Sequence, residues 1–215
     1  MRMALIVPIK SFSEAKGRLD DVLSAAQREQ LARWSAGRIV KSLETQSDHD
    51  VSVIVVCEGD DVQQWCAAEK IKFVVPLEPG LDAAARAGVD EATREDADFV
   101  IIAHADLAHP EDLELVIHDH SQNLITLVPD LDFNGTNVIA MPTCAVNDFG
   151  FEFMYGPGSF MRHAQCAESV AEMSDLSLFV IDDSVLSIDI DTSDDLDIPS
   201  VRAVLPFRLE TGDKQ

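Results

Sequence analysis

Four basic residues stand within the first eighteen positions of an otherwise acidic chain: Arg2, Lys10, Lys16 and Arg18. The whole sequence of 215 residues carries a formal net charge of −23 at pH 7. Lysine binds phosphate oxygens as a point charge, whereas arginine presents a planar fork that holds two oxygens at once. The segment VPIKSFSEAKGRL (residues 7–19) is therefore a candidate anion-binding loop. The alternative is a solvated loop whose cations offset the acidic surface.

Aspartates in two separate stretches could bind a divalent cation. Asp106 follows an apolar run, and Asp189 and Asp191 lie two residues apart in SIDIDTSDDL (187–196). Alternate side chains of an extended segment leave on the same face, so these carboxylates repel each other unless a cation lies between them. Hard oxygen ligands favour Mg²⁺, with Mn²⁺ as an alternative. The competing interpretation is a polar cluster at a strand end that leads into a helix cap at Thr192.

Two further loops carry glycine, NGTN (134–137) and YGPGSF (155–160). The second loop leads into a helical pattern at Ser159, and a helix start lined by glycine offers free backbone N–H groups to an anion. Tight turns are the alternative for both loops. Neither a GxGxxG nor a GxxxxGK[ST] pattern is present, so no dinucleotide fingerprint or P-loop is predicted.

The histidines of HADLAHPEDLELVIHDH (104–120) suggest zinc at first sight. On a helix, however, His118 and His120 would point roughly 200° apart, and no cysteine lies nearby. We therefore predict surface histidines at a helix end. The four cysteines (Cys57, Cys66, Cys144 and Cys166) show no CxxC spacing and are predicted to be free thiols.

Apolar runs of strand length alternate with helical patterns along nearly the whole chain. The predicted strands are 4–9, 51–57, 72–76, 98–103, 124–128, 137–141, 178–181 and 186–190. Continuous Val/Ile runs are typical of strands buried on both faces, and the alternation predicts an α/β fold with a doubly wound, mostly parallel sheet. Ligands bind beyond the carboxyl ends of such strands. We expect one domain over residues 1–205 and a C-terminal tail over 206–215.

Three helix starts are visible in the sequence. Ser24 with Gln27 forms a capping box for a helix over 24–46. A second helix is predicted to begin at Pro110, and the last one at Thr192.

The strong negative charge argues against nonspecific nucleic-acid binding. No apolar stretch approaches the roughly 20 residues that cross a bilayer, so we expect no membrane span and a cytoplasmic location. The sequence leaves the oligomeric state open, including a homo-oligomer.

Six stretches, taken together and in order, resemble the 2-phospho-L-lactate and phosphoenolpyruvate guanylyltransferases (CofC or FbiD). These stretches are VPIKSFSEAKGRL, PGLDAAARAG (79–88), HADL, NGTN, YGPGSF and DIDTSDDL. The resemblance implies a GT-A-like nucleotidyltransferase fold and an enzyme of coenzyme F-420 biosynthesis. Such an enzyme joins GMP from GTP to a phosphorylated three-carbon acid and releases pyrophosphate. The sequence does not choose among 2-phospholactate, phosphoenolpyruvate and 3-phosphoglycerate.

The resemblance also implies roles for matching positions. The catalytic cations that hold the GTP phosphates would be Lys10, Lys16 and Arg18. The residues near the base and ribose would be Pro79, Gly80, Leu81, Asp82 and Ala83. The metal-binding aspartates would be Asp106, Asp189 and Asp191, and the acid would be held by Thr136, Gly156 and Ser159. Two positions depart from the family pattern, because Asp82 replaces the usual asparagine and Ala108 the usual proline.

Two other functions compete with this one. Another nucleotidyltransferase of the same fold could act on a molybdopterin or a sugar phosphate, although the glycine-rich start of that group is absent here. A non-catalytic acidic domain could bind a protein or divalent ions, and it would release no pyrophosphate from a nucleotide.

Overall fold

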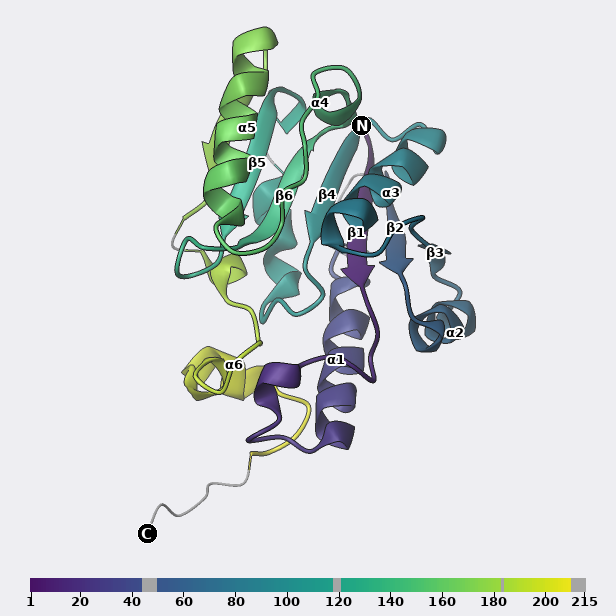
Figure 1. The fold of residues 1–215 in the computed structure, drawn as a ribbon, viewed down its shortest axis with the longest axis vertical. Helices are drawn as coiled ribbons and strands as arrows, with labels where there is room; N and C mark the ends of the chain where they lie inside the picture. The colour runs from purple at the N-terminus through teal and green to yellow at the C-terminus, as the bar shows by residue number, and fades with distance from the viewer. Residues whose placement is uncertain (44–49, 118–120, 183, 210–215) are drawn as a thin grey trace.

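Seven of the eight predicted strands form one sheet, with boundaries within two residues of those expected. The structure is a computed structural model that describes residues 1–43, 50–117, 121–182 and 184–209. The sheet order is β3-β2-β1-β4-β6-β5-β7 (Figure 1). The strands are β1 (Arg2–Ile9), β2 (Asp50–Cys57), β3 (Lys72–Val74), β4 (Phe99–Ala103), β5 (Leu124–Pro129), β6 (Thr136–Pro142) and β7 (Ser177–Val180).

The sheet is mostly parallel, as predicted. β1 pairs in parallel with both β2 and β4, β2 with β3, and β5 with β7. β6 lies between β4 and β5 and is antiparallel to both. Because the chain leaves β1 toward β2 on one side and later returns to β4 on the other, the topology reverses at β1. A ligand site is expected beyond the carboxyl ends of the strands at such a reversal.

The eighth predicted strand, 186–190, is wrong. Val185–Ser187 form a 3₁₀ turn, capped by a hydrogen bond from the Leu186 N–H to the Ser184 hydroxyl. The following residues run beside the turn after β4, where Leu107 and Asp189 form an isolated bridge. The apolar residues of this segment do alternate with polar ones, but the segment packs against a loop and does not join the sheet.

Helices cover both faces of the sheet (Figure 1). Alternate residues of β1 point to opposite faces, so that Met3 and Leu5 pack with α1 and α2 while Ala4 and Ile6 pack with α3 and α5. The helices are α1 (Ala25–Ile39), α2 (Asp60–Glu69), α3 (Leu81–Arg94), α4 (Thr143–Asn147), α5 (Ser159–Met173) and α6 (Pro199–Val204). Gly88 lets α3 lie close to β1, because a Cβ there would collide with the side chain of Ile6.

The predicted helix starts meet different outcomes. The capping box is confirmed, since Ser24 accepts from the Gln27 N–H and the Gln27 side chain accepts from the Ser24 N–H. The helix ends at Ile39, well before the predicted 46, and residues 44–49 lie outside the described ranges. The segment from Pro110 forms a 3₁₀ helix to Val116. The last helix begins at Pro199, after a 3₁₀ turn over Asp195–Asp197, and not at Thr192.

A third apolar cluster, here called the base cluster, lies outside the sheet. It joins the start of the chain to its end and comprises Leu19, Leu23, Leu31, Ala108, Ile190, Leu196 and Val201. In Figure 1 the purple turn after β1 accordingly lies beside the yellow α6. Phe207 and Leu209, in the segment predicted as a tail, pack against this cluster, and residues 210–215 lie outside the described ranges.

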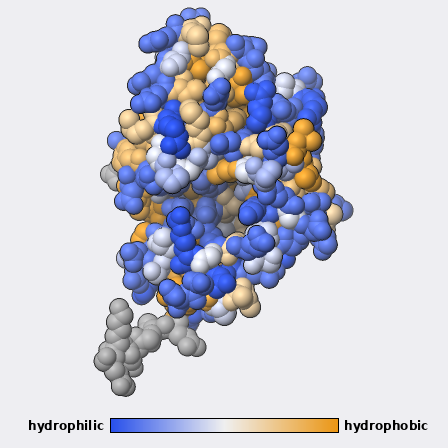
Figure 2. All heavy atoms as spheres, in the orientation of Figure 1, coloured by the Kyte–Doolittle hydropathy of each residue, from blue (hydrophilic) through white to orange (hydrophobic). Residues whose placement is uncertain are grey.

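The four cysteines are free thiols, as predicted. Within the described ranges, no helix combines the length and the apolar character needed to cross a membrane. Hydrophilic residues cover much of the face shown in Figure 2, with apolar patches between them.

Candidate active site

A cleft of about 770 Å³ opens at the carboxyl ends of β1, β2 and β4. The structure brings eight of the predicted site residues to its walls: Lys10, Lys16, Pro79, Gly80, Leu81, Asp106, Asp189 and Asp191. These residues come from four separate parts of the sequence. The sheet edge therefore gathers the three predicted metal residues and most of the predicted nucleotide residues, where the topology leads us to expect a ligand site.

Lys16 and Asp106 form a short ion pair in the cleft. The Lys16 ammonium donates to Asp106 Oδ2 at 2.6 Å, and the Lys16 side chain is 6% exposed. Burial raises the pKa of Asp106, but the charge and hydrogen bond of Lys16, together with His104, outweigh it and leave that pKa below its usual value. Asp106 Oδ1 is buried and has no hydrogen-bond partner. One carboxylate oxygen is thus free for a further cation.

Arg18 forms a second ion pair with an aspartate, donating to Asp191 Oδ2 at 2.8 Å. Arg18 is 75% exposed and lies outside the cleft wall, although its partner is part of that wall. Cations predicted for phosphate and carboxylates predicted for metal therefore contact one another. They belong to one charged site.

Asp189 occupies the buried end of the acidic group. Burial raises its pKa to about 7, and the neighbouring charges of Asp106 and Asp195 add to this effect. The side chain of Ile190 is fully buried in the base cluster, so the predicted alternation across 188–191 is correct. The alternative of a capping cluster also holds in part, because Asp195 accepts from the N–H groups of Asp191 and Thr192.

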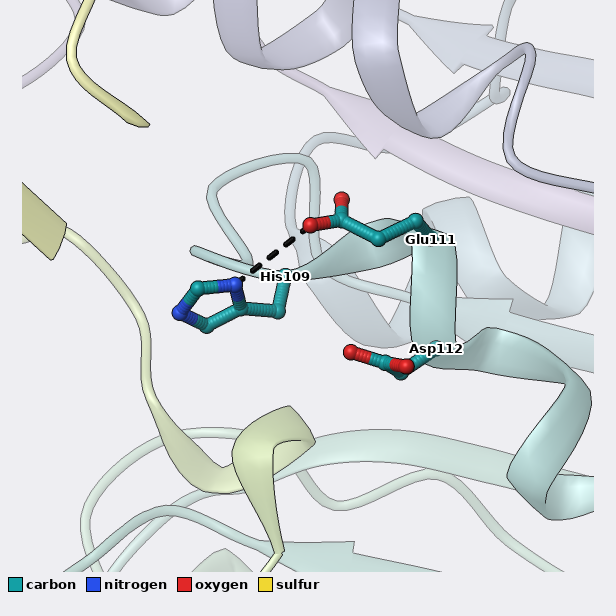
Figure 3. A group of neighbouring side chains, drawn as sticks. All are labelled: His109, Glu111 and Asp112. Atoms are coloured by element: carbon teal, nitrogen blue, oxygen red, sulfur yellow. Dashed lines mark hydrogen bonds and ion pairs between the residues drawn. The ribbon is translucent and has the colours of Figure 1, made fainter. Parts of the chain in front are cut away.

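The three predicted metal aspartates do not form a closed ligand set. Among the described residues, the group of possible metal-binding side chains with ligand atoms within 4.8 Å of one another is His109, Glu111 and Asp112 (Figure 3). In this cluster the His109 Nδ1 lies 3.4 Å from a Glu111 oxygen. The Arg38 guanidinium already binds Glu111 and supplies its counter-charge. This second cluster is therefore a poor cation site.

The histidine prediction needs one correction. His104 is not a surface residue at a helix end but lines the cleft, where burial lowers its pKa. His118 and His120 lie outside the described residues.

The start of α3 forms another part of the cleft wall. Gly80 has φ +113°, a conformation that favours glycine, and its N–H donates to Glu58 at 2.8 Å. Glu58 lines the cleft and was missed in the sequence, although, like Asp106, it follows a predicted strand. Asp82 and Ala83 follow in the helix, outside the cleft wall. Asp82 instead accepts from the Tyr155 N–H at 2.6 Å and ties α3 to the YGPGSF loop.

The residues predicted for the acid lie together, away from the cleft wall. The Thr136 and Ser159 hydroxyls are 3.4 Å apart and both side chains are buried. Gly156 lies shortly before Ser159 and has φ +104°, and the Gly158 N–H donates to Asn134. The NGTN and YGPGSF loops are thereby joined.

His163 is the residue of this cluster that sequence reasoning missed. It stands one turn after Ser159 on α5, and this i, i+4 spacing was the available signal. Its Nε2 accepts from the Met154 N–H at 2.8 Å, so Nδ1 carries the proton and donates to Thr136 at 3.0 Å. Burial, with the Arg162 charge, lowers its pKa to about 4. The imidazole is neutral at neutral pH.

Between residues 3 and 198 the sequence matches the family of CofC-like guanylyl transferases. The chain belongs to this family. Two relatives illustrate its range. A phosphoenolpyruvate guanylyltransferase of Sphaerobacter thermophilus is 30% identical over 200 residues, which cover 92% of each chain. A 2-phospho-L-lactate guanylyltransferase of Methanocaldococcus fervens is 27% identical, over 90% of this chain and 83% of the relative.

Solved structures resemble this guanylyltransferase in fold at low sequence identity. A protein of Desulfovibrio desulfuricans G20, described as a nucleotide-diphospho-sugar transferase, has a TM-score of 0.66 at 13% identity, over 88% of this chain and 82% of that one. A cytidylyltransferase of Leptospira borgpetersenii has a TM-score of 0.52 at 15% identity, over 91% and 83%. These likenesses confirm the predicted nucleotidyltransferase fold. Membership of the guanylyl transferase family removes the two rival functions.

Proposed function

We propose that this guanylyltransferase joins GMP from GTP to a phosphorylated three-carbon acid in the biosynthesis of coenzyme F-420, in the cytoplasm. The observation that carries the proposal is the charged site at the sheet edge, where Lys16 meets Asp106 and Arg18 meets Asp191. Such a site offers cations for a polyphosphate beside carboxylates for its counter-ion. Relatives over most of the chain are named for two acids of this class.

GTP would lie across the cleft. Its phosphates would contact Lys10, Lys16 and Arg18, and its guanosine would lie against the start of α3. Pro79, Gly80 and Leu81 line the cleft there, which supports this placement. Asp82 and Ala83 would act through the shape of the first helical turn, because the Asp82 carboxylate is engaged with the Tyr155 N–H.

The cleft residues fit a hard divalent ion, Mg²⁺ or Mn²⁺. The donors are carboxylates, and the buried Asp106 Oδ1 has no partner within the protein. Asp106, Asp189 and Asp191 would hold the ion together with phosphate oxygens. When bound, it would neutralise charge on the phosphates. The three carboxylates do not form a closed ligand set, so substrate oxygens would complete the coordination.

The acid would bind near Thr136, Gly156 and Ser159. The hydroxyls and the start of α5 supply donors for an anion. Reaction begins when a phosphate oxygen of the acid attacks the α-phosphorus of GTP. The bond from that phosphorus to the bridging oxygen breaks, and pyrophosphate leaves. The attacking oxygen is already anionic, so no general base is needed, and the protein contributes alignment and the positive charge of its cations.

A pyrophosphate-release assay tests the proposal. Purified protein is given GTP and Mg²⁺ with 2-phospholactate, phosphoenolpyruvate or 3-phosphoglycerate, and the product is identified by mass. We expect release that needs one of the acids, with a product containing GMP joined to that acid. Parallel reactions with ATP and CTP measure base selectivity. Absence of acid-dependent release with GTP, or equal rates with all three nucleotides, would contradict the proposal.

A further inference from the structure

We infer that Asp61 is a positioning residue for guanylyl transfer, because its carboxylate fixes the loop that carries Lys10 and Lys16. The inference rests on the proposed function, which assigns these two cations to GTP. Asp61 itself lies in the first turn of α2, outside the cleft wall. It would therefore act through the loop and not by touching substrate.

The carboxylate binds three successive residues of the loop. Asp61 Oδ2 accepts from the Phe12 N–H at 2.8 Å, from the Ser13 N–H at 3.0 Å and from the Ser11 hydroxyl at 3.1 Å. Its other oxygen accepts from the Val62 N–H at 2.9 Å, within α2. One side chain thus organises a loop about fifty positions earlier in the chain.

Other contacts hold the same loop against α1 and the start of α2. The Gly59 N–H donates to the Lys10 carbonyl at 2.8 Å. The Phe12 side chain is buried, with its ring 5.4 Å from that of Trp65 and under the Arg33 guanidinium. These contacts fix where the loop lies. Asp61 fixes which way its backbone N–H groups point.

This arrangement changes how the loop can hold phosphate. In a glycine-rich phosphate loop the backbone N–H groups bind the anion directly. Here the Phe12 and Ser13 N–H groups are already taken by an internal carboxylate. The contribution of the loop to phosphate binding then falls to the side chains of Lys10 and Lys16, which flank the clamped residues. Their spacing depends on the shape that Asp61 imposes.

A carboxylate is the group that this position requires. Burial raises the pKa of Asp61, but the bonds from Ser13, Ser11 and Phe12 outweigh it and keep the group ionised. An amide offers one acceptor oxygen, and its NH₂ group would face an N–H donor on either the loop side or the α2 side. Asp61→Asn keeps the size of the side chain but loses one of the two acceptor oxygens that face N–H donors.

The test compares Asp61→Asn with Asp60→Asn. Asp60 is the exposed neighbour in the same helical turn, so the control removes the same charge from the same helix start without contacting the loop. We expect Asp61→Asn to raise the KM for GTP at least tenfold while the KM for the acid stays within twofold. Ser11→Ala should give a smaller change in the same direction, and Asp61→Glu should recover part of the loss. Asp60→Asn should match the wild type.

Hydrogen exchange of the protein without nucleotide gives a second readout. The Phe12 and Ser13 amides should exchange at least tenfold faster in Asp61→Asn, while the amides of β1 stay protected. An unchanged KM for GTP in Asp61→Asn would overturn the inference, as would equal losses in both variants or a fall in activity that only tracks the folded fraction. A wild type inactive with GTP would instead overturn the proposed function, and with it the role of Asp61.

Discussion

Lys16 and Arg18 carry the same charge but sit in different surroundings, and the consequences of removing them should differ. Lys16 is almost fully buried on Asp106, whereas Arg18 reaches Asp191 from an exposed position. Losing one partner of a buried ion pair leaves an uncompensated charge in a poorly solvated place. Losing one partner of an exposed pair costs little, because water replaces it.

We therefore expect Lys16→Ala to lower both stability and activity, and Arg18→Ala to lower activity alone. The unfolding free energy in urea should fall by about 3 kcal/mol for Lys16→Ala and by less than about 1 kcal/mol for Arg18→Ala. Steady-state kinetics with GTP should show reduced kcat/KM in both. Equal stabilities for the two variants would contradict the assignment of Lys16–Asp106 as the structural pair.

The acidic group makes a separate prediction about metal. Asp191→Asn removes a carboxylate from the cleft with little change in shape, and catalysis by a bound ion contributes several kcal/mol. Activity at limiting Mg²⁺ should fall on the order of 100-fold, with partial recovery as Mg²⁺ is raised. Asp194→Asn is the matched control, because Asp194 is exposed nearby and makes no side-chain cap. A Mg²⁺ dependence like that of the wild type would remove Asp191 from the ligand set.

At the scale of elements, the junction of β6 and α5 depends on a neutral histidine. His163 accepts from the Met154 N–H, which a protonated ring cannot do. Its pKa is lowered to about 4 in the folded protein. Between that value and the ordinary value of about 6.5, the unfolded chain binds a proton that the folded chain does not. The contribution of neutral His163 to the free energy of unfolding is thus fully present above about pH 6.5 and is lost as the pH falls toward 4.

The corresponding experiment measures unfolding at pH 7 and pH 5. The His163 contribution should fall by about 2 kcal/mol between these values. His163→Gln keeps an acceptor for the Met154 N–H without titrating, so its stability should fall less over the same range. The difference between the two proteins isolates this site from the many other acidic groups. If the free energy of unfolding changed with pH in the same way for wild type and variant, His163 would not titrate on unfolding.

Elements differ in how far local sequence determines them. The capping box of Ser24 and Gln27 is a bond between near neighbours, and it forms as predicted. The Thr136, Ser159 and His163 cluster joins two elements, and only the first two were proposed from sequence. The segment 186–190 has the alternation of a strand, yet its neighbours are the turn after β4 and the base cluster. Apolar alternation indicates that one side of a segment is buried, but it does not identify the element against which that side packs.

At the scale of the whole molecule, the base cluster supports the charged site from below. Leu196 is 3% exposed and packs with Leu19 from the first loop and Ile190 from the acidic segment. The cluster therefore holds the first loop beside the acidic segment, where Arg18 donates to Asp191. Packing in this cluster should affect catalysis as well as stability.

Leu196→Ala tests this link. Removing a buried leucine side chain should lower the unfolding free energy by about 3 kcal/mol. Leu176→Ala is the control, because Leu176 is similarly buried in the cluster on the α3 and α5 face of the sheet. We expect similar losses of stability, measured in urea, but a reduced kcat/KM of the folded protein for Leu196→Ala alone. Equal kinetics in both variants would contradict a role for the base cluster in shaping the site.

The sequence by itself determined the strands of the sheet, its mostly parallel character and the candidate charged groups. These features follow from hydrophobic runs and from residue chemistry, which are local properties. It also indicated the family through six ordered stretches. The resemblance assigned roles to residues in those stretches but gave no partner for any side chain.

Only the tertiary structure decided which groups meet. Lys16 lies ninety positions from Asp106, and the two meet because the strands that precede them end at one edge of the sheet. Arg18 lies still farther from Asp191, and these two meet because the base cluster holds their segments together. The clamp of Asp61 on the first loop and the loss of the eighth strand have the same origin. Contacts between distant segments depend on the register and direction of the elements that carry them, and no local pattern records these.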